Sequence, residues 1–303
     1  MNVTTRGMLF LVGLAATMLG PASALGFQQT MTCTQSGLYA CEPGEEPKAV
    51  HWNARCVRYR INENGTNNFT RTSKDVPAIE ELRRSVAQSF AAWTQVPCSD
   101  MTLVDGGLTS HTNANFDPKE PDQNSNLVIW RDQGWSQVAS ARAFALTSVT
   151  FNPRNGVIAD ADIEVNTEFY KFSAGEEPKA NHVDMRNTMT HEVGHFIGLD
   201  HTEVREATMF STAPVGETAK RSLHPDDIEG LCTTYPSSGE ETQRQCNSAS
   251  DFPSGDDLDL DGGVCTVTGI DASPPSSMAL ALLSILGLLG LAAHRKTATP
   301  CKH

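Results

Sequence analysis

Alternation of hydrophobic and polar residues in the middle of the chain predicts a layered domain that begins with strands. Between Arg55 and Asn62, the apolar residues Val57, Tyr59 and Ile61 alternate with polar residues, which is the period of a half-buried strand. Four later apolar segments predict further strands: residues 101–104, 126–130, 144–151 and 156–165.

A helix is expected directly after Pro77. Apolar residues recur there at spacings of three and four, with charged residues on the opposite side: Ile79, Leu82, Val86, Phe90 and Trp93. Strands around one early helix predict an α/β arrangement in layers.

An apolar run near each end of the chain indicates export. Residues 1–24 combine one arginine, a short apolar run and a small-residue motif ending at Ala24, which is typical of a cleaved signal peptide. Residues 276–294 are apolar on all sides and precede a basic tail, residues 295–303. This second run predicts a transmembrane or sorting helix with a cytoplasmic tail, and hence a cell-envelope or cell-surface protein that is anchored or released by C-terminal processing.

Between these ends, three regions are expected: a short Cys-containing segment (25–50), a folded body (51–236) and a polar acidic linker (237–275). Within the linker, Asp257–Gly262 copies the start of a calcium loop, but Thr268 stands where a bidentate glutamate is expected. A solvated spacer is therefore favoured over a calcium site.

The charge of the chain argues against one class of function, and its cysteines predict disulfides. The net charge of −13 and the absence of a Lys/Arg run argue against nucleic-acid binding, which needs clustered cations. Of the eight cysteines, six in an exported body are expected to form disulfides. Of the 15 possible pairings, we expect Cys33–Cys41, Cys56–Cys98 and Cys232–Cys246.

The motif HEVGHFIGLDH carries the candidate chemistry. His191 and His195 lie about 40° apart on a helix, so both imidazoles can reach one ion. Gly198 can end this helix in a left-handed turn that brings His201 back toward them. Three neutral imidazoles leave the fourth position of a tetrahedral ion for water, which predicts one catalytic zinc. Glu192, next to His191, can act as the general base for that water.

This motif resembles that of the metzincin zinc endopeptidases, and the segment that follows resembles the matrixins among them. The resemblance implies a twisted mixed sheet with two long helices, and a small C-terminal subdomain containing a methionine turn and a last helix. It implies that Met209 packs beneath the histidines without binding zinc. Asp226 and Asp227 would tie the last helix to the floor of the site, the alternative being that they only cap the helix.

The sequence departs from the matrixin pattern at two places. It contains no propeptide motif of the Pro-Arg-Cys-Gly type, which keeps matrixins latent. The stretch that should hold a second, structural zinc lacks histidine and offers Asp160, Asp162 and Glu164, so calcium or simple solvated loop acids are the alternatives there. The C-terminal layout from Cys265 onward is similar to myxobacterial surface-sorting tags.

These features predict an exported zinc-dependent endopeptidase that acts on protein or peptide substrates extended along an edge strand. A non-catalytic, zinc-containing surface or adhesion module is the alternative from another class. The retained Glu192 argues against it, because a structural site needs no base. A metal-dependent hydrolase of other substrates shares the motif, and the sequence indicates no oligomeric state.

Overall fold

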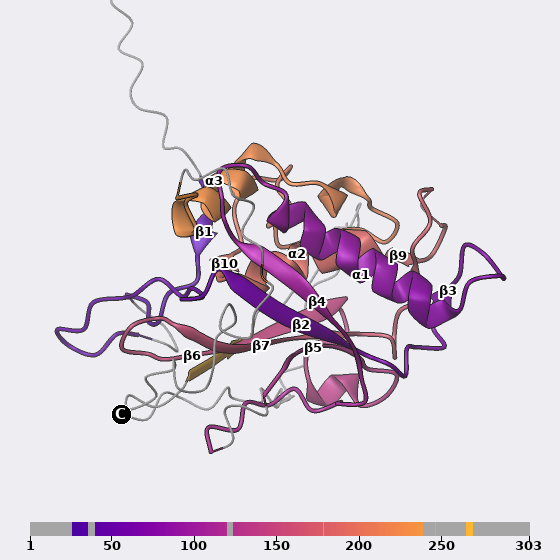
Figure 1. Cartoon of the computed structure of the whole chain (residues 1–303), viewed down its shortest axis with the longest axis horizontal. Helices are drawn as coiled ribbons and strands as arrows, with labels where there is room; N and C mark the ends of the chain where they lie inside the picture. Colours follow the sequence, from indigo (N-terminus) through magenta and orange to yellow (C-terminus); the bar gives the residue numbers. More distant parts are fainter. Residues whose placement is uncertain are drawn as a thin grey trace, which may run out of the picture.

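The computed structural model describes residues 26–35, 40–119, 124–177, 179–238, 246 and 265–268. Its centre is a twisted sheet of strand order β11-β6-β7-β5-β2-β4, shown in Figure 1. The strands are β2 (Cys56–Asn62), β4 (Thr102–Thr109), β5 (Asn126–Trp130), β6 (Ala145–Phe151), β7 (Ile158–Val165) and β11 (Cys265–Thr268). Strands β4, β2, β5 and β7 run parallel, whereas β6 is antiparallel to β7 and β11 is antiparallel to β6.

Three α-helices and several short elements complete the described part of the chain. The helices are α1 (Ala78–Thr94), α2 (Met185–Phe196) and α3 (Pro225–Thr234), with 3-10 turns η2 (Trp135–Gln137) and η3 (Ala219–Arg221). Two small sheets are also present. One pairs β1 (Gln28–Gln29) with β10 (Leu199–Asp200). The other has the strand order β3 (Phe69–Thr70), β8 (Phe172–Ser173) and β9 (Val183–Asp184). This mixed sheet with few helices confirms the predicted α/β fold class, and the helix expected after Pro77 is α1.

The core lies between the sheet and the two long helices. Apart from Ile79, which is only partly buried, the apolar residues of β2 and α1 predicted from periodicity are buried there. Residues of α2 join them, and the set is Val57, Tyr59, Ile61, Leu82, Val86, Phe90, Trp93, Met185, Met189, Val193 and Phe196. The rings of Tyr59 and Phe90 stack with centroids 3.6 Å apart. Trp93 donates its indole N–H to the carbonyl of Thr190 at 2.8 Å, which fixes α2 relative to α1.

The acidic residues Asp160, Asp162 and Glu164 are buried on β7, not solvated in a loop as one of the sequence-based alternatives held. They alternate with Ala161 and Ile163, which face the core, and therefore lie on the other face of the sheet. The amide of Leu127 donates to Asp162 at 2.8 Å, and Glu164 pairs with Arg131. Burial raises the pKa of Asp160 to about 7, although a hydrogen bond with Asp162 partly offsets that rise.

Replacing Asp160 with asparagine should flatten the pH dependence of stability near neutrality. A carboxyl group whose folded-state pKa is raised stabilises the fold at low pH, and this contribution is lost as the pH rises through about 7. The wild type should therefore lose about 1–2 kcal/mol more than Asp160→Asn between pH 6 and pH 8. Denaturant unfolding at both pH values gives the free energy of unfolding of each protein. Subtracting the change in the variant from the change in the wild type removes the contribution of the histidines, which both proteins share. Identical pH profiles would contradict the assignment.

The disulfides correct two of the three predicted pairs. Cys33–Cys41 is present, whereas Cys56 pairs with Cys246 and Cys98 pairs with Cys232. The chain returns beside the end of α1 after α3, where Ser237 donates its amide to the carbonyl of Cys98 at 2.9 Å. Tertiary proximity, and not closeness in sequence, therefore selects Cys232 as the partner of Cys98.

Several expected segments lie outside the described residues: the signal peptide, the calcium-loop-like Asp257–Gly262 and the apolar run 276–294. Among the residues that are described, no helix has the length and apolar character needed to cross a bilayer. The region expected to be a linker differs from that expectation at one place, because Cys265–Thr268 forms β11 on the sheet.

Candidate active site

Helix α2 carries the first two histidines on a frame that is fixed at both ends. Asp184 caps its N-terminus by accepting the amide of Asn187 at 2.8 Å. Past its C-terminus, Gly198 has φ +89°, and a Cβ at this position would lie 2.2 Å from the carbonyl oxygen of Val50. Only glycine fits this left-handed, closely packed turn, which directs the chain toward His201.

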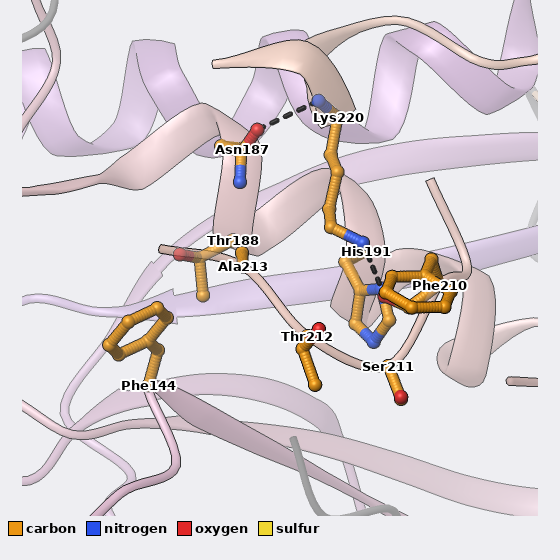
Figure 2. A pocket seen from close by; sticks show the side chains of 9 residues that line it. All are labelled: Phe144, Asn187, Thr188, His191, Phe210, Ser211, Thr212, Ala213 and Lys220. Atoms are coloured by element: carbon orange, nitrogen blue, oxygen red, sulfur yellow. Dashed lines mark hydrogen bonds between the residues drawn. The ribbon is translucent and has the colours of Figure 1, made fainter. Parts of the chain in front are cut away.

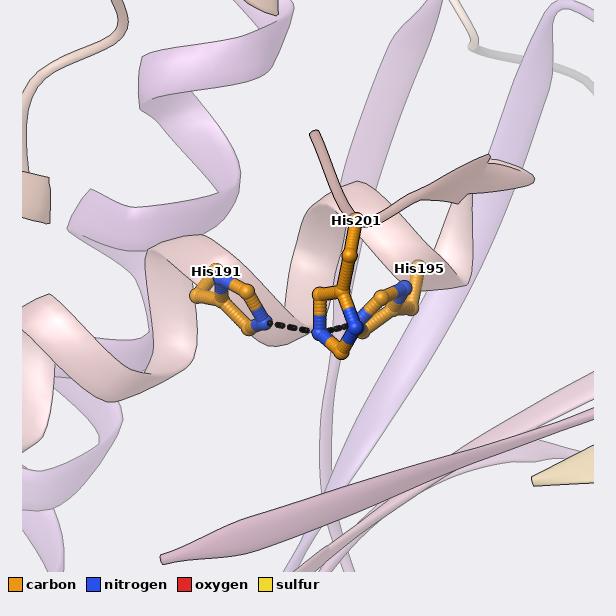
Figure 3. Close-up of side chains that lie close together, drawn as sticks. All are labelled: His191, His195 and His201. Atoms are coloured by element: carbon orange, nitrogen blue, oxygen red, sulfur yellow. Dashed lines mark hydrogen bonds between the residues drawn. The ribbon is translucent and has the colours of Figure 1, made fainter. Parts of the chain in front are cut away.

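The three histidines of the motif converge on one point, as Figure 3 shows. The Nε2 atom of His201 lies 3.2 Å from Nε2 of His191 and 3.1 Å from Nε2 of His195. His191 and His195 are buried, whereas His201 is partly exposed, so the cluster is open to solvent on one side.

Backbone acceptors orient two of these imidazoles for metal binding. Nδ1 of His191 lies 2.6 Å from the carbonyl of Thr208, and Nδ1 of His195 lies 2.9 Å from the carbonyl of Leu199. A carbonyl can only accept, so each Nδ1 carries the proton and each Nε2 lone pair points into the cluster. Two nitrogen ligands on a tetrahedral zinc lie about 3.3 Å apart for bonds of about 2.0–2.1 Å. The observed spacing fits such an ion.

Glu192 lies beside this cluster on α2 and is almost fully buried. Thr147 of β6 donates its hydroxyl to Oε2 of Glu192 at 2.6 Å. This contact fixes the carboxylate between the helix and the sheet, next to the histidines but outside their ligand set. Sequence reasoning did not single out Thr147, since it lies 45 residues earlier, in a strand with no motif of its own.

The turn at Met209 packs directly under the histidine helix. A Cβ on Gly194 would lie 2.1 Å from the sulfur of Met209, so the thioether fills the space that this glycine leaves. Asp227 accepts the amides of Thr208 and Met209 at 2.8 and 3.0 Å. The second acid of the Asp-Asp pair therefore joins α3 to the turn.

Asp226 makes no such connection to the turn. It lies in the first turn of α3, is 8% exposed, and its amide donates to the imidazole of His224 at 3.2 Å. Its Oδ2 atom has no hydrogen-bond partner among the described residues. The two acids, which were expected to act alike, therefore have different roles. Asp227 binds the methionine turn, whereas Asp226 lies at the N-terminus of α3, where the helix dipole favours a carboxylate.

Lys220 is a buried cation at the site that sequence reasoning missed. Its ammonium donates to the carbonyl of Thr208 at 3.1 Å and to that of Phe210, and its amide donates to Asn187 of α2 at 2.8 Å. The Thr208 carbonyl is also the acceptor for His191. Lys220 therefore holds the carbonyl groups of the turn, while Asp227 holds its amides.

Replacing Lys220 with methionine should lower the free energy of unfolding by about 1–3 kcal/mol, because buried carbonyl groups lose their donor. Denaturant unfolding with saturating zinc is the measurement. The control is Lys119→Met, at an exposed position, which should change stability by less than about 0.5 kcal/mol. An equal effect of both substitutions would show that the ammonium does not support the turn.

A pocket opens beside His191, as Figure 2 shows. It is lined by Phe144, Asn187, Thr188, His191, Phe210, Ser211, Thr212, Ala213 and Lys220. Two aromatic rings and several hydroxyl groups make its wall both apolar and polar. The wall comes from Phe144 just before β6, from α2, from the residues after the methionine turn and from Lys220 of η3, so four segments of the chain form it.

Comparison with known proteins places this site in a family. The chain is 26% identical over 217 residues to metalloendoproteinase 2-MMP of Arabidopsis thaliana, covering 70% of this chain and 51% of that protein. It is 33% identical over 117 residues to mouse matrix metalloproteinase-19 (36% and 22% covered) and 23% identical over 224 residues to human neutrophil collagenase (72% and 41%). The chain thus spans about half or less of the length of these relatives. Residues 51–236 match the matrixin family, and this chain belongs to that family of metalloendopeptidases.

Proposed function

We propose that this protein is an exported zinc endopeptidase in which Glu192 is the general base. The observation that carries the proposal is the open cluster of His191, His195 and His201 with the carboxylate of Glu192 beside it. A structural zinc site would be closed by a fourth protein ligand, whereas this cluster is open on the side of His201.

The roles of the residues follow from their positions. His191, His195 and His201 would hold a zinc ion, which would supply Lewis acidity toward the scissile carbonyl and the attacking water. Glu192 accepts a proton from the attacking water and delivers it to the leaving amine. The hydroxyl of Thr147 holds Oε2 of Glu192 and so keeps the carboxylate aimed during both transfers.

An extended peptide is the substrate that suits this geometry. Strand β6 is next to the site through Thr147, and a peptide can add to such a strand by backbone hydrogen bonds. The pocket beside His191 would then receive one substrate side chain. Backbone pairing gives binding that is independent of sequence, and the pocket gives a preference at one position.

The test is hydrolysis of a mixed peptide library by the purified protein. We expect cleavage with zinc, loss with 1,10-phenanthroline and recovery when zinc is restored. Cleavage that is unaffected by the chelator, or no cleavage by zinc-loaded protein, would contradict the proposal and favour a non-catalytic module.

Export is supported by the cysteine chemistry. Three disulfides occur among the described residues, and such bonds persist in oxidising compartments. We expect the signal peptide to be removed after Ala24 and residues 276–294 either to anchor the protein or to be lost in processing. Cell fractionation and intact mass separate these outcomes. Full-length protein free in the medium would contradict both.

A further inference from the structure

The outer edge of β6 is covered by the protein's own C-terminal region. Strand β11 pairs antiparallel with β6, with Cys265 opposite Phe151 and Thr268 opposite Ser148. In Figure 1 it is the short yellow strand beside β6. Without β11, β6 would be the edge of a five-stranded sheet with unpaired backbone groups.

This edge leads directly to the catalytic centre. Thr268, the last residue of β11, lies opposite Ser148, and the next residue toward the start of β6 is Thr147, which holds Glu192. A peptide added to this edge would use the same backbone groups of β6 as β11 does. The described strand and an extended substrate therefore compete for one position.

A disulfide keeps the C-terminal region near this edge. Cys246 is bonded to Cys56 at the start of β2, and β11 begins 19 residues later. The first residue of β11 lies opposite Phe151 of β6. On its other side, Phe151 pairs with Ile158 at the start of β7. Strands β2 and β7 run parallel to the same intervening strand, so the disulfide and the start of β11 lie at the same end of the sheet. A tether this short gives an effective concentration on the order of 1 mM.

We propose that the outer edge of β6 is a binding surface for Cys265–Thr268, and that this segment restrains the protease by occupying the place of a peptide substrate. The inference rests on the proposed function for its effect on activity, but the contact itself does not depend on activity. It supplies a means of restraint in a chain that contains no motif of the Pro-Arg-Cys-Gly type.

The first experiment uses proline in the full-length chain. Of two consecutive strand residues, one directs its N–H group to the neighbouring strand. Thr266→Pro/Val267→Pro therefore removes a donor to β6 whichever residue provides it. We expect KM for a peptide substrate to fall about tenfold with kcat unchanged, since a tethered competitor is lost.

The matched control is Thr266→Ala/Val267→Ala, which keeps both N–H groups and should stay within about twofold of the wild type. Intact mass before and after each assay verifies that the chains remain whole. Equal KM values for the proline variant and the wild type would overturn the proposed restraint.

A second experiment examines the contact without catalysis. In a Glu192→Ala background, hydrogen exchange of the β6 amides that face β11 should be at least about tenfold slower than in the same background with both prolines. Equal exchange would overturn the contact. If the difference in exchange is observed but no variant cleaves any peptide, the proposed function is wrong and the binding surface is correct.

A third experiment restores the segment in trans. A synthetic peptide of residues 262–270 should inhibit the proline variant competitively, whereas the same peptide with both prolines should not. If neither peptide inhibits at concentrations up to about 1 mM, the effective concentration of the tethered segment, the proposed competition for the edge of β6 is wrong.

Discussion

Replacing Glu192 with alanine should lower kcat/KM for peptide hydrolysis by about 10²- to 10⁴-fold while the protein keeps its zinc. The substitution removes the carboxylate that moves the proton but leaves His191, His195 and His201 in place. Zinc content by mass spectrometry and kcat/KM on one peptide are the two measurements. Retained zinc with retained turnover would show that another group acts as the base.

Two further variants give this prediction its controls. His195→Ala should lose both zinc and activity, because it removes a ligand from a set of three. Thr147→Val should keep zinc and lose a smaller part of kcat, because it removes only the hydroxyl that orients Oε2 of Glu192. Loss of zinc in Glu192→Ala would mean that the carboxylate supports the metal site, and the kinetic result could not be assigned to proton transfer.

Removing the Cys98–Cys232 disulfide should have a large effect on stability. The bond closes a loop with a sequence separation of 134 residues between the end of α1 and α3. In the chain-entropy model, a cross-link over such a loop stabilises the fold by about 5 kcal/mol. Cys98→Ser/Cys232→Ser should therefore lower the free energy of unfolding by about 3–5 kcal/mol, as measured by denaturant unfolding without reductant.

The chain provides a matched comparison for this value. Cys33–Cys41 closes a loop with a separation of only 8 residues, for which the same model gives about 2.5 kcal/mol. Cys33→Ser/Cys41→Ser should thus cost about half as much. If removing the short-loop bond cost as much as removing the long-loop bond, loop entropy would not be the source of the stabilisation.

Local periodicity was sufficient to predict the main elements of the fold. The segments 126–130 and 55–62 were expected as strands and are β5 (Asn126–Trp130) and β2 (Cys56–Asn62) with at most one residue of difference. The helix after Pro77 is α1. These predictions succeed because a strand or helix that buries one face against a core must repeat its apolar residues at the period of its backbone.

The histidine cluster was also predictable, because its three members lie within eleven consecutive residues. Helix geometry brings His191 and His195 together, and one glycine turn returns His201. By contrast, Thr147 and Lys220 reach the site from elements that have no local motif. Only the packing of α2 against β6 and η3 shows that they touch Glu192 and the methionine turn.

Residues close together in the chain were therefore enough to predict the five long strands of the sheet, helix α1 and the three-histidine motif. The partners of Cys56 and Cys98, the burial of Asp160 and the pairing of β11 with β6 could be read only from the folded domain. Each of these is a contact between segments distant in sequence, and many pairings of such segments satisfy the same local pattern. Packing of the whole domain selects one of them, because only that arrangement buries the apolar faces and satisfies the backbone groups together.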